Sequence, residues 1–406
     1  MHVMNGGITE AKKRWAYLAL AMLCLLFGGV VYAWSILKVP FAEEFGWQTA
    51  ALTLNFTLTM CFFCFGGIAG GTLSKRYGTK IALLTAAALA CAGFMSVSFL
   101  SGGSIVLLYI SYGLMGGLGI GISYNVIIST VGAWFPDKKG LSSGCMMMAF
   151  GASALVLGNA VSALMNAPAI GWRFAFRVLA AGIGIVLAVS AFVLRRPPEE
   201  VKTSPAPESE SGGTADFTTR EMLRRPSFFR LFIALSFMSA VGNSVIAFAR
   251  DLALSMNAAA ALATTLVGLL SVCNGLGRII TGALFDAVGR RKTTVFVSAL
   301  NIATVTALLI AVLASSLEIL IAALVLTGLS YGTCPSITSV YAMEFYGVRY
   351  FPVNFSVMNF NLMGAALLAS GYGVLLSASG GYVVPIAALL VLSLIAAVLN
   401  ITTRKP

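Results

Sequence analysis

Apolar residues occur in twelve long runs along the chain, separated by shorter polar segments. All of these runs reach the roughly 20 residues that an α-helix needs to cross the hydrocarbon core of a bilayer. Strict alternation of apolar and polar residues, the pattern of membrane β-strands, is absent. The pattern therefore predicts an all-α membrane protein with twelve transmembrane helices. The predicted helices span residues 15–37, 49–73, 80–100, 104–131, 141–165, 174–194, 228–250, 260–285, 293–314, 317–342, 355–376 and 381–401.

The one long polar segment, residues 195–226, divides the twelve runs into two groups of six. It is rich in Pro, Ser, Gly and charged residues, a composition that cannot bury a core. We interpret it as a cytoplasmic linker with a short surface helix near residues 218–223. The predicted organisation is a cytoplasmic N-tail (1–14), a six-helix bundle (15–194), the linker (195–226), a second six-helix bundle (227–401) and a cytoplasmic C-tail (402–406).

The two halves share a short motif. Residues 71–80, Gly-Thr-Leu-Ser-Lys-Arg-Tyr-Gly-Thr-Lys, recur 211 positions later as Gly-Ala-Leu-Phe-Asp-Ala-Val-Gly-Arg-Arg at residues 282–291. At the same offset, Trp134 at the end of the fourth predicted helix aligns with Phe345 at the end of the tenth. An internal duplication of six helices, giving two pseudo-symmetric bundles, follows from this repetition.

The composition is typical of an integral membrane protein, since 59% of the residues are hydrophobic and 10% are charged. The formal charge of +12 does not indicate nucleic-acid binding, because most of the basic residues fall on one side of the membrane in the predicted topology. With the N-terminus in the cytoplasm, only Lys38, Arg173, Arg177 and Arg250 fall toward the outer side. The cytoplasmic side receives the basic residues of the linker and Lys12, Lys13, Arg14, Lys75, Arg76, Lys80, Lys138, Lys139, Arg195, Arg196, Arg290, Arg291, Lys292, Arg349, Arg404 and Lys405. This asymmetry predicts cytoplasmic positions for both termini.

Other motifs give no sign of catalysis. The first apolar run is longer than a signal-peptide core, so we expect a retained helix. Cys61 and Cys64 form a CxxC pair within an apolar run without further ligands, which favours packing over metal or redox chemistry. The glycines between Gly113 and Gly121 favour close helix packing, since no strand precedes them. Residues 140–144 have the spacing of a nucleophile elbow, but His2 is the only histidine. We therefore expect no enzyme activity, cofactor or metal.

Arg278 is the only charged residue between Leu262 and Phe285. A guanidinium near the middle of a membrane helix costs at least about 3 kcal/mol on insertion scales, so it is normally kept to meet an anion or a counter-charge. Asn274 and Ser271 precede Arg278 by four and seven residues and share its helical face. The opposite face carries Leu269, Leu276 and Ile280. We predict that the polar stripe faces protein or water and binds an anionic substrate.

The motif at residues 282–292, with its weaker copy in the first half, resembles the signature loop of the major facilitator superfamily of transporters. The resemblance covers essentially the whole chain, since the 6 + 6 helices and the central linker also match. It implies a cytoplasmic gate, in which charge contacts between helix ends hold the two bundles together. The gate residues would be Gly282, Asp286, Gly289, Arg290 and Arg291. Lys75 replaces the acidic residue in the first copy, which predicts a weaker latch there.

Further segments resemble the monocarboxylate transporter family and its bacterial relatives, which include the oxalate:formate antiporter group. They are residues 32–35, 41–47 and 171–176, and Asn274-x-x-x-Arg278. Animal members are similar in the last segment but carry Asp at the position of Asn274. Their arginine binds the substrate carboxylate, and the Asp takes part in proton coupling. The resemblance therefore implies an anion-binding role for Arg278, whereas Asn274 departs from the proton-coupling pattern.

Two more departures concern basic residues. The lysine that the family carries in helix 1 falls near Ile36, with Lys38 close by, and the second basic residue of the oxalate exchanger has no counterpart in residues 357–372. One buried cation suits one carboxylate, so we favour a monocarboxylate such as lactate or pyruvate. Further contacts are expected from other helices that line the cleft in this fold. The candidates are Tyr331, Tyr124, Tyr32, Asn359 and Phe360.

The resemblance thus implies a secondary active transporter in a bacterial inner membrane, with a small monocarboxylate anion and a proton as partners and no obligatory protein partner. Asp251, near the outer end of the seventh helix, is the proton-coupling candidate, because closure of an outer gate would favour its neutral form. A surface pair between Asp251 and Arg250 is the alternative interpretation. For the whole protein, the alternatives are an organic-anion exchanger without net proton movement and a transporter-like ligand sensor.

Overall fold

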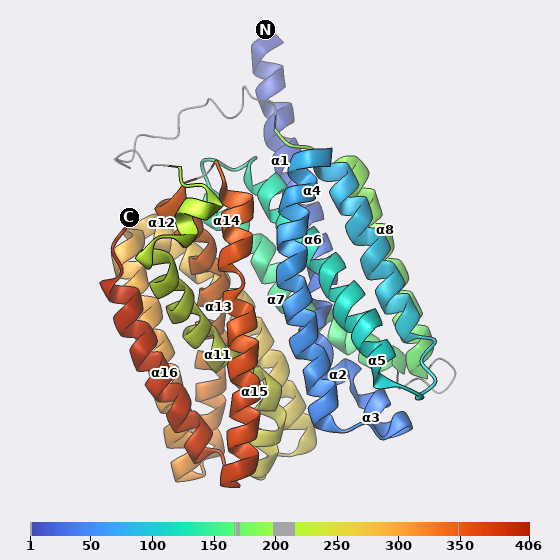
Figure 1. Ribbon diagram of the computed structural model, residues 1–406, viewed down its shortest axis with the longest axis vertical. Coiled ribbons are helices and arrows are strands. Elements are labelled where there is room, and N and C mark those ends of the chain that lie inside the picture. Colours follow the sequence, from blue (N-terminus) through green and yellow to red (C-terminus); the bar gives the residue numbers. More distant parts are fainter. Residues whose placement is uncertain (1, 166, 168–170, 198–215, 348) are drawn as a thin grey trace. The chain divides into compact units, whose positions relative to one another are not determined.

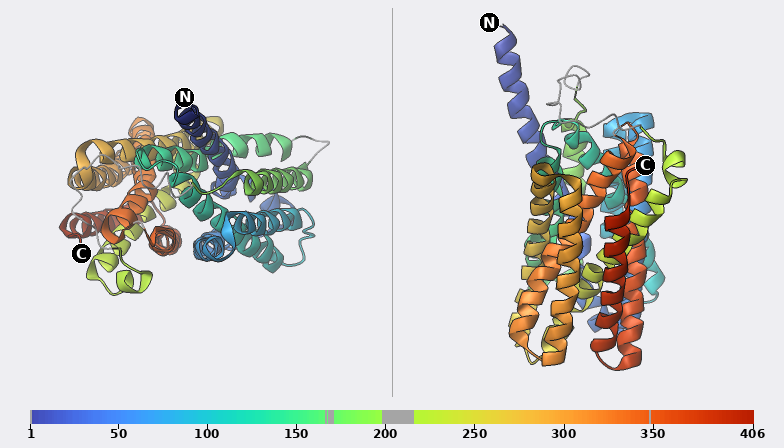
Figure 2. Two further views of the ribbon diagram at one scale, coloured as in Figure 1. Left: turned by 90° about the horizontal axis from the view of Figure 1, so that it is seen from above. Right: turned by 90° about the vertical axis from the view of Figure 1, so that its left-hand side faces the viewer.

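The computed structural model describes residues 2–165, 167, 171–197, 216–347 and 349–406, and Figures 1 and 2 show their arrangement. The described residues contain helices and no strand, so the all-α prediction is confirmed. The chain divides into two compact units, Met1–Thr214 and Ala215–Pro406. The division falls within the predicted linker, of which residues 198–215 lie outside the described part.

The N-terminal unit holds the first group of helices. They are α1 (His2–Gly28), the 3₁₀ helix η1 (Gly29–Ala33), α2 (Trp34–Leu37), α3 (Val39–Phe45), α4 (Thr49–Val97), α5 (Ile105–Leu108), the π-helix η2 (Tyr109–Gly116), α6 (Gly117–Gly132), α7 (Lys139–Met165) and α8 (Gly171–Val193). The C-terminal unit holds α10 (Thr219–Leu223), α11 (Pro226–Ser255), α12 (Ala260–Ala314), α13 (Leu317–Tyr346), α14 (Phe351–Met358), α15 (Asn361–Ser379) and α16 (Val383–Thr402).

Ten segments of the described chain are long and apolar enough to cross a membrane, and two of them are long enough to cross twice. Helices α4 and α12 have 49 and 55 residues, about 75–80 Å at the helical rise if they were straight. Each is interrupted by a glycine in a left-handed conformation, Gly78 (φ 85°) and Gly289 (φ 76°). An L-residue reaches this region of φ only with strain, so glycine suits both turns.

Contacts on either side of these glycines show that the chain reverses direction there. In the N-terminal unit, Gly121 of α6 approaches Phe63 of α4, while the neighbouring Gly119 approaches Ala90. Phe63 and Ala90 would be about 40 Å apart on a straight helix. In the C-terminal unit, residues 328–330 of α13 likewise meet both Cys273 and Asn301 of α12. Each long helix therefore forms two membrane-spanning segments, and the predicted count of twelve is confirmed.

The same three close contacts occur in both units, which confirms the duplication. A Cβ atom added at any of six glycines would fall against a backbone carbonyl oxygen of the neighbouring helix. In the N-terminal unit the pairs are Gly66 with Leu118, Gly117 with Thr59 and Gly121 with Phe63. In the C-terminal unit they are Gly277 with Leu329, Gly328 with Leu270 and Gly332 with Asn274, each residue 211 positions after its counterpart.

Several helix details differ from the predicted ones. Helix α1 begins at His2, before the predicted start of the first span, and its membrane-crossing part begins at Lys13. The first span ends in the 3₁₀ helix η1, where Gly29 packs against the backbone of Phe150. The predicted helix 355–376 is interrupted at residues 359–360, between α14 and α15. The predicted surface helix of the linker is present as α10, which Thr218 and Glu221 cap reciprocally.

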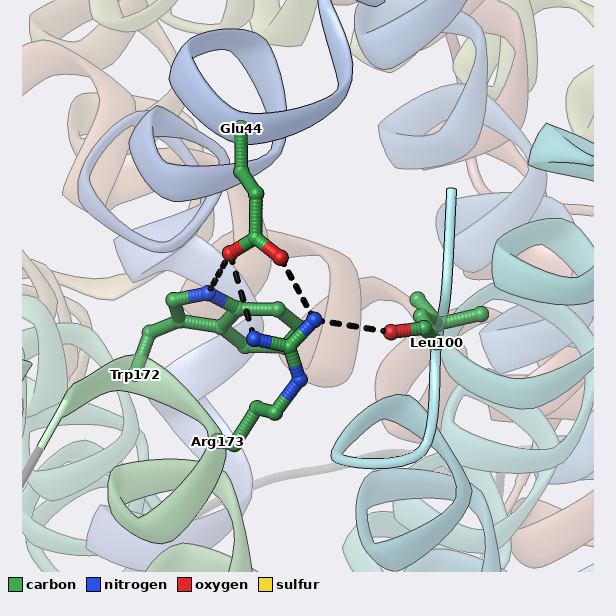
Figure 3. A network of polar contacts seen from close by, with 4 residues as sticks. All are labelled: Glu44, Leu100, Trp172 and Arg173. Atoms are coloured by element: carbon green, nitrogen blue, oxygen red, sulfur yellow. Dashed lines mark hydrogen bonds and ion pairs between the residues drawn. The ribbon is translucent and has the colours of Figure 1, made fainter. Parts of the chain in front are cut away.

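An ion-pair network ties three segments of the N-terminal unit together, as Figure 3 shows. The Glu44 carboxylate of α3 accepts hydrogen bonds from Nη2 of Arg173 and from Nε1 of Trp172, both at 2.6 Å. Arg173 also donates to the carbonyl oxygen of Leu100 at 3.1 Å. The guanidinium of Arg173, followed by the indole N–H of Trp172, lowers the pKa of Glu44 below its ordinary value. Two of the segments that resemble the monocarboxylate transporter family thus meet at this network.

We expect Gly332→Ala to lower the thermal stability of the purified protein, because the added Cβ would overlap the carbonyl oxygen of Asn274. Overpacking of this kind typically costs about 1–3 kcal/mol. Gly371→Ala in α15 is the matched control, since no atom lies within 4 Å of its added Cβ. Equal unfolding temperatures for the two variants would contradict the close contact between α12 and α13.

We expect Glu44→Gln to destabilise the protein by about 1 kcal/mol or less, because the ion pair is about two-fifths exposed on both sides. A carboxyl group with a lowered pKa in the folded state stabilises it above the unfolded-state pKa of about 4.5. This stabilisation is lost as the pH falls through the lower folded-state value. Thermal unfolding of both proteins between pH 7 and pH 3 should show a difference that disappears at the acidic end. A constant difference would argue against the ion pair.

Candidate functional site

Arg278 lies in the first half of α12, and only 1% of it is exposed. Its Nε donates a hydrogen bond to Oδ1 of Asn274, one turn earlier, at 3.2 Å. Asn274 is also buried, whereas Leu276 and Ile280 on the opposite face are 46% and 44% exposed. Burial therefore confirms the predicted polar face at Arg278 and Asn274 and the predicted apolar face at Leu276 and Ile280. Leu269, which was predicted on the apolar face, is half-buried.

Helix α13 fixes the backbone around Arg278. The close approach of Gly332 to the Asn274 carbonyl also brings α13 to the backbone nitrogen of Arg278, which would lie 3.0 Å from an added Cβ. One turn further along α13, Oγ of Ser336 donates to the carbonyl oxygen of Arg278 at 3.1 Å. Because the contact glycines have no side chain, α13 can pack directly against the backbone of α12. This packing fixes the part of the backbone that carries the Arg278 guanidinium.

Tyr331 brings a third helix into this polar region. It is fully buried in α13, and its hydroxyl donates to Oδ1 of Asn243 in α11 at 2.7 Å. Gly242 lies directly beside the Tyr331 ring, where no larger residue would fit. Helices α11, α12 and α13 thus place polar side chains in the interior of the C-terminal unit.

The remaining substrate-binding candidates of the C-terminal unit are Ser271, Asn359 and Phe360. Ser271 is half-buried, and its hydroxyl donates to the Val267 carbonyl at 3.2 Å, within the same helix. Asn359 and Phe360 form the interruption between α14 and α15. The next residue, Asn361, accepts a hydrogen bond from Ser239 of α11 at 3.3 Å, which ties the interruption to that helix.

Tyr32 and Tyr124 lie in the N-terminal unit, and the structure brings them together. Both rings pack edge-on against Phe150 of α7, with ring centroids 5.4 and 5.0 Å apart. Tyr32 belongs to the 3₁₀ helix η1 and Tyr124 to α6. Sequence reasoning identified the two tyrosines separately and missed Phe150, whose place between them depends on long-range packing.

Asp251 is exposed near the end of α11. Neither Asp251 nor Arg250 takes part in an ion pair within the described part of the chain. The surface ion pair between Arg250 and Asp251, which was the alternative interpretation, is therefore not formed in this structure. Burial, followed by the negative charge of Asp251, raises the pKa of the Tyr382 hydroxyl above its ordinary value.

The predicted gate motif makes one ion pair in the described chain. Arg290 follows the turn at Gly289, and its Nε lies 3.3 Å from Oε1 of Glu344 at the end of α13. Its guanidinium also lies over the Phe345 ring, 5.2 Å from the centroid. Asp286 and Arg291 are exposed. Sequence reasoning expected such a contact with a helix end but did not identify Glu344.

Comparison with known proteins places the chain among membrane transporters. A sequence model described as Major Facilitator Superfamily matches residues 18–360. The oxalate:formate antiporter of Oxalobacter formigenes is 31% identical over 290 residues, which cover 71% of this chain and 67% of the antiporter. Monocarboxylate transporter 13 of Bos taurus is 25% identical over 265 residues, which cover 64% of this chain and 58% of the relative.

Solved structures show the same fold. The proton:xylose symporter XylE, bound to 6-bromo-6-deoxy-D-glucose, superposes with a TM-score of 0.78 at 15% identity, covering 96% of this chain and 95% of the symporter. A bacterial homologue of the human lysosomal transporter Spinster gives a TM-score of 0.69 at 15% identity, covering 96% and 97% of the two chains. At these identities the likeness concerns the fold alone.

Proposed function

This chain belongs to the major facilitator superfamily of transporters, and we propose that it carries a small monocarboxylate of the lactate or pyruvate type by alternating access. The observation that carries this proposal is the burial of Arg278 within a membrane-spanning helix, oriented by Asn274. We place both termini in the cytoplasm on the distribution of the basic residues. The similarity to a bacterial antiporter supports a bacterial inner membrane as the location.

The chemistry of Arg278 suits a carboxylate. A guanidinium donates two parallel hydrogen bonds to the two oxygens of a carboxylate, and such charge-assisted pairs are roughly twice as strong as neutral ones. The hydrogen bond from Nε to Asn274 restrains the plane of the guanidinium. Because Asn274 is a neutral amide, it orients the cation without cancelling its charge. The bound anion would then offset part of the cost of keeping Arg278 in the membrane.

The number of buried cations favours a monocarboxylate. Residues 357–372, where the resemblance predicts a second basic residue for an oxalate exchanger, contain no Lys or Arg. The relative named for oxalate and formate handles one dicarboxylate and one monocarboxylate, so its name alone does not choose between them. A second carboxylate next to a single cation would be buried without a matching charge, which is costly.

We infer proton-coupled symport as the first mode of coupling, with Asp251 as the proton site. Asp251 is a carboxylate that forms no ion pair within the described chain, so a proton can neutralise it without breaking one. Organic-anion exchange is the second candidate. It is favoured by Asn274, which cannot carry a proton where the animal relatives have Asp, and by the similarity to an antiporter.

We expect Arg278→Lys to reduce the initial rate of labelled L-lactate uptake into proteoliposomes by at least about tenfold. An ammonium is a point charge that cannot reproduce the two parallel hydrogen bonds, and one hydrogen bond to a charged group contributes about 1.5–3 kcal/mol. Arg220→Lys, an exposed position in α10, is the matched control and should transport like the wild type. Wild-type kinetics in Arg278→Lys would refute the assigned role.

The coupling mode is tested by Asp251→Asn. If Asp251 carries the proton, this variant should lose lactate accumulation driven by an inward proton gradient while lactate-for-lactate exchange continues. The reason is that an amide cannot take up and release the proton that links transport to the gradient. Accumulation at the wild-type level would exclude Asp251 as the proton site. Exchange is supported instead if the wild-type protein shows trans-stimulation and does not respond to a pH gradient.

A further inference from the structure

An open cavity of about 500 Å³ lies in the N-terminal unit, between the turn at Gly78 and the end of α8. It is separate from Arg278, which belongs to the other unit. Its lining includes three cationic residues and no acidic one. The principal lining residues are Thr79, Lys80, Phe192, Leu194, Arg195 and Arg196.

The walls of this cavity are held in place by neighbouring helices. Nη2 of Arg196 donates to Oγ of Ser74 in α4 at 3.0 Å. The indole nitrogen of Trp134 donates to the carbonyl oxygen of Arg195 at 2.8 Å. The hydroxyls of Thr79 and Thr130 lie 3.3 Å apart. The cationic residues therefore extend from a backbone that is fixed before any ligand binds.

The charges of the cavity suit an anion with several oxygens. None of the three ion pairs between described side chains includes Lys80, Arg195 or Arg196. The Lys80 ammonium lies over the Phe192 ring, 4.4 Å from its centroid, and aromatic faces hold an ammonium without neutralising it. Two guanidinium groups and one ammonium match a phosphate group, whose oxygens accept several charge-assisted hydrogen bonds.

The surface beside the cavity indicates that the phosphate belongs to a lipid. Phe192, Val189 and Ile185 follow one another along one face of α8 and are 59%, 48% and 63% exposed. Their spacing of three and four residues aligns them along the helix. The stripe is about 10 Å long, compared with about 15 Å for the hydrocarbon of one leaflet. Because α8 is a membrane-spanning segment, this apolar stripe runs from the cavity into the membrane.

We propose that this cavity binds the phosphate headgroup of an anionic phospholipid, with an acyl chain along the Phe192–Val189–Ile185 stripe. Basic pockets between membrane helices are a known form of headgroup recognition, and juxtamembrane cations are attracted to anionic leaflets. The site would anchor the turn between the second and third spans to the end of the sixth. It does not depend on the identity of the transported substrate.

The test is equilibrium binding of dioctanoyl phosphatidylglycerol to the purified full chain in a neutral detergent. We expect Arg195→Gln/Arg196→Gln to weaken binding by about 25-fold, since each cation near an anionic lipid contributes about fivefold. Arg220→Gln/Arg224→Gln is the matched control, because it removes the same charge from the exposed α10 region and should bind like the wild type. If the double variant does not fold, Lys80→Gln alone should weaken binding about fivefold.

Three further probes identify the source of the phosphate. Dioctanoyl phosphatidylcholine, inorganic phosphate and glycerol 3-phosphate should each bind much more weakly than phosphatidylglycerol. Ile185→Ser, which lies on the apolar stripe and outside the cavity lining, should weaken phosphatidylglycerol binding but not glycerol 3-phosphate binding. Equal phosphatidylglycerol binding in the Arg195/Arg196 variant and its control would refute the site. Inorganic phosphate or glycerol 3-phosphate bound as tightly as the lipid would show a soluble-anion site and overturn the lipid assignment.

Discussion

A guanidinium within a membrane-spanning helix requires polar surroundings, because hydrocarbon offers it neither water nor hydrogen bonds. The C-terminal unit supplies polar groups around Arg278. Asn274 accepts from its Nε, Ser336 donates to its carbonyl, and Tyr331 and Asn243 extend the polar region to a third helix. The exposed face of the same helix remains apolar. Contacts among α11, α12 and α13 thus keep Arg278 buried and hold its backbone in place.

The helix packing that surrounds this cation is not special to the C-terminal unit, because it is part of the internal duplication. The glycine contacts between α12 and α13 repeat those between α4 and α6, 211 positions earlier. The positions that correspond to Arg278 and Asn274 in the first half are Gly67 and Phe63. The same helix packing therefore serves a polar region in one unit and an apolar, aromatic one in the other, where Phe63 packs on Tyr124. This asymmetry is consistent with recognition of an anion by one half of the protein.

Sequence patterns were sufficient for the number of spans, the duplication and the burial of Arg278, since each depends on hydrophobicity, spacing or a single charge. They were insufficient where conformation depends on distant contacts. The interruption at Asn359 and Phe360, the 3₁₀ helix η1 and the π-helix η2 have no local signal that separates them from continuous helix. Asn243 and Glu344 were missed because one polar residue becomes informative only when its partner, Tyr331 or Arg290, is known.

Equilibrium binding of labelled L-lactate would show whether Arg278 binds a single carboxylate. The label would be bound to purified wild-type protein and to Arg278→Ala, with pyruvate, formate and oxalate as unlabelled competitors. We expect saturable lactate binding that monocarboxylates displace, that oxalate displaces poorly and that the alanine variant lacks. Lactate binding that survives in Arg278→Ala would contradict this expectation.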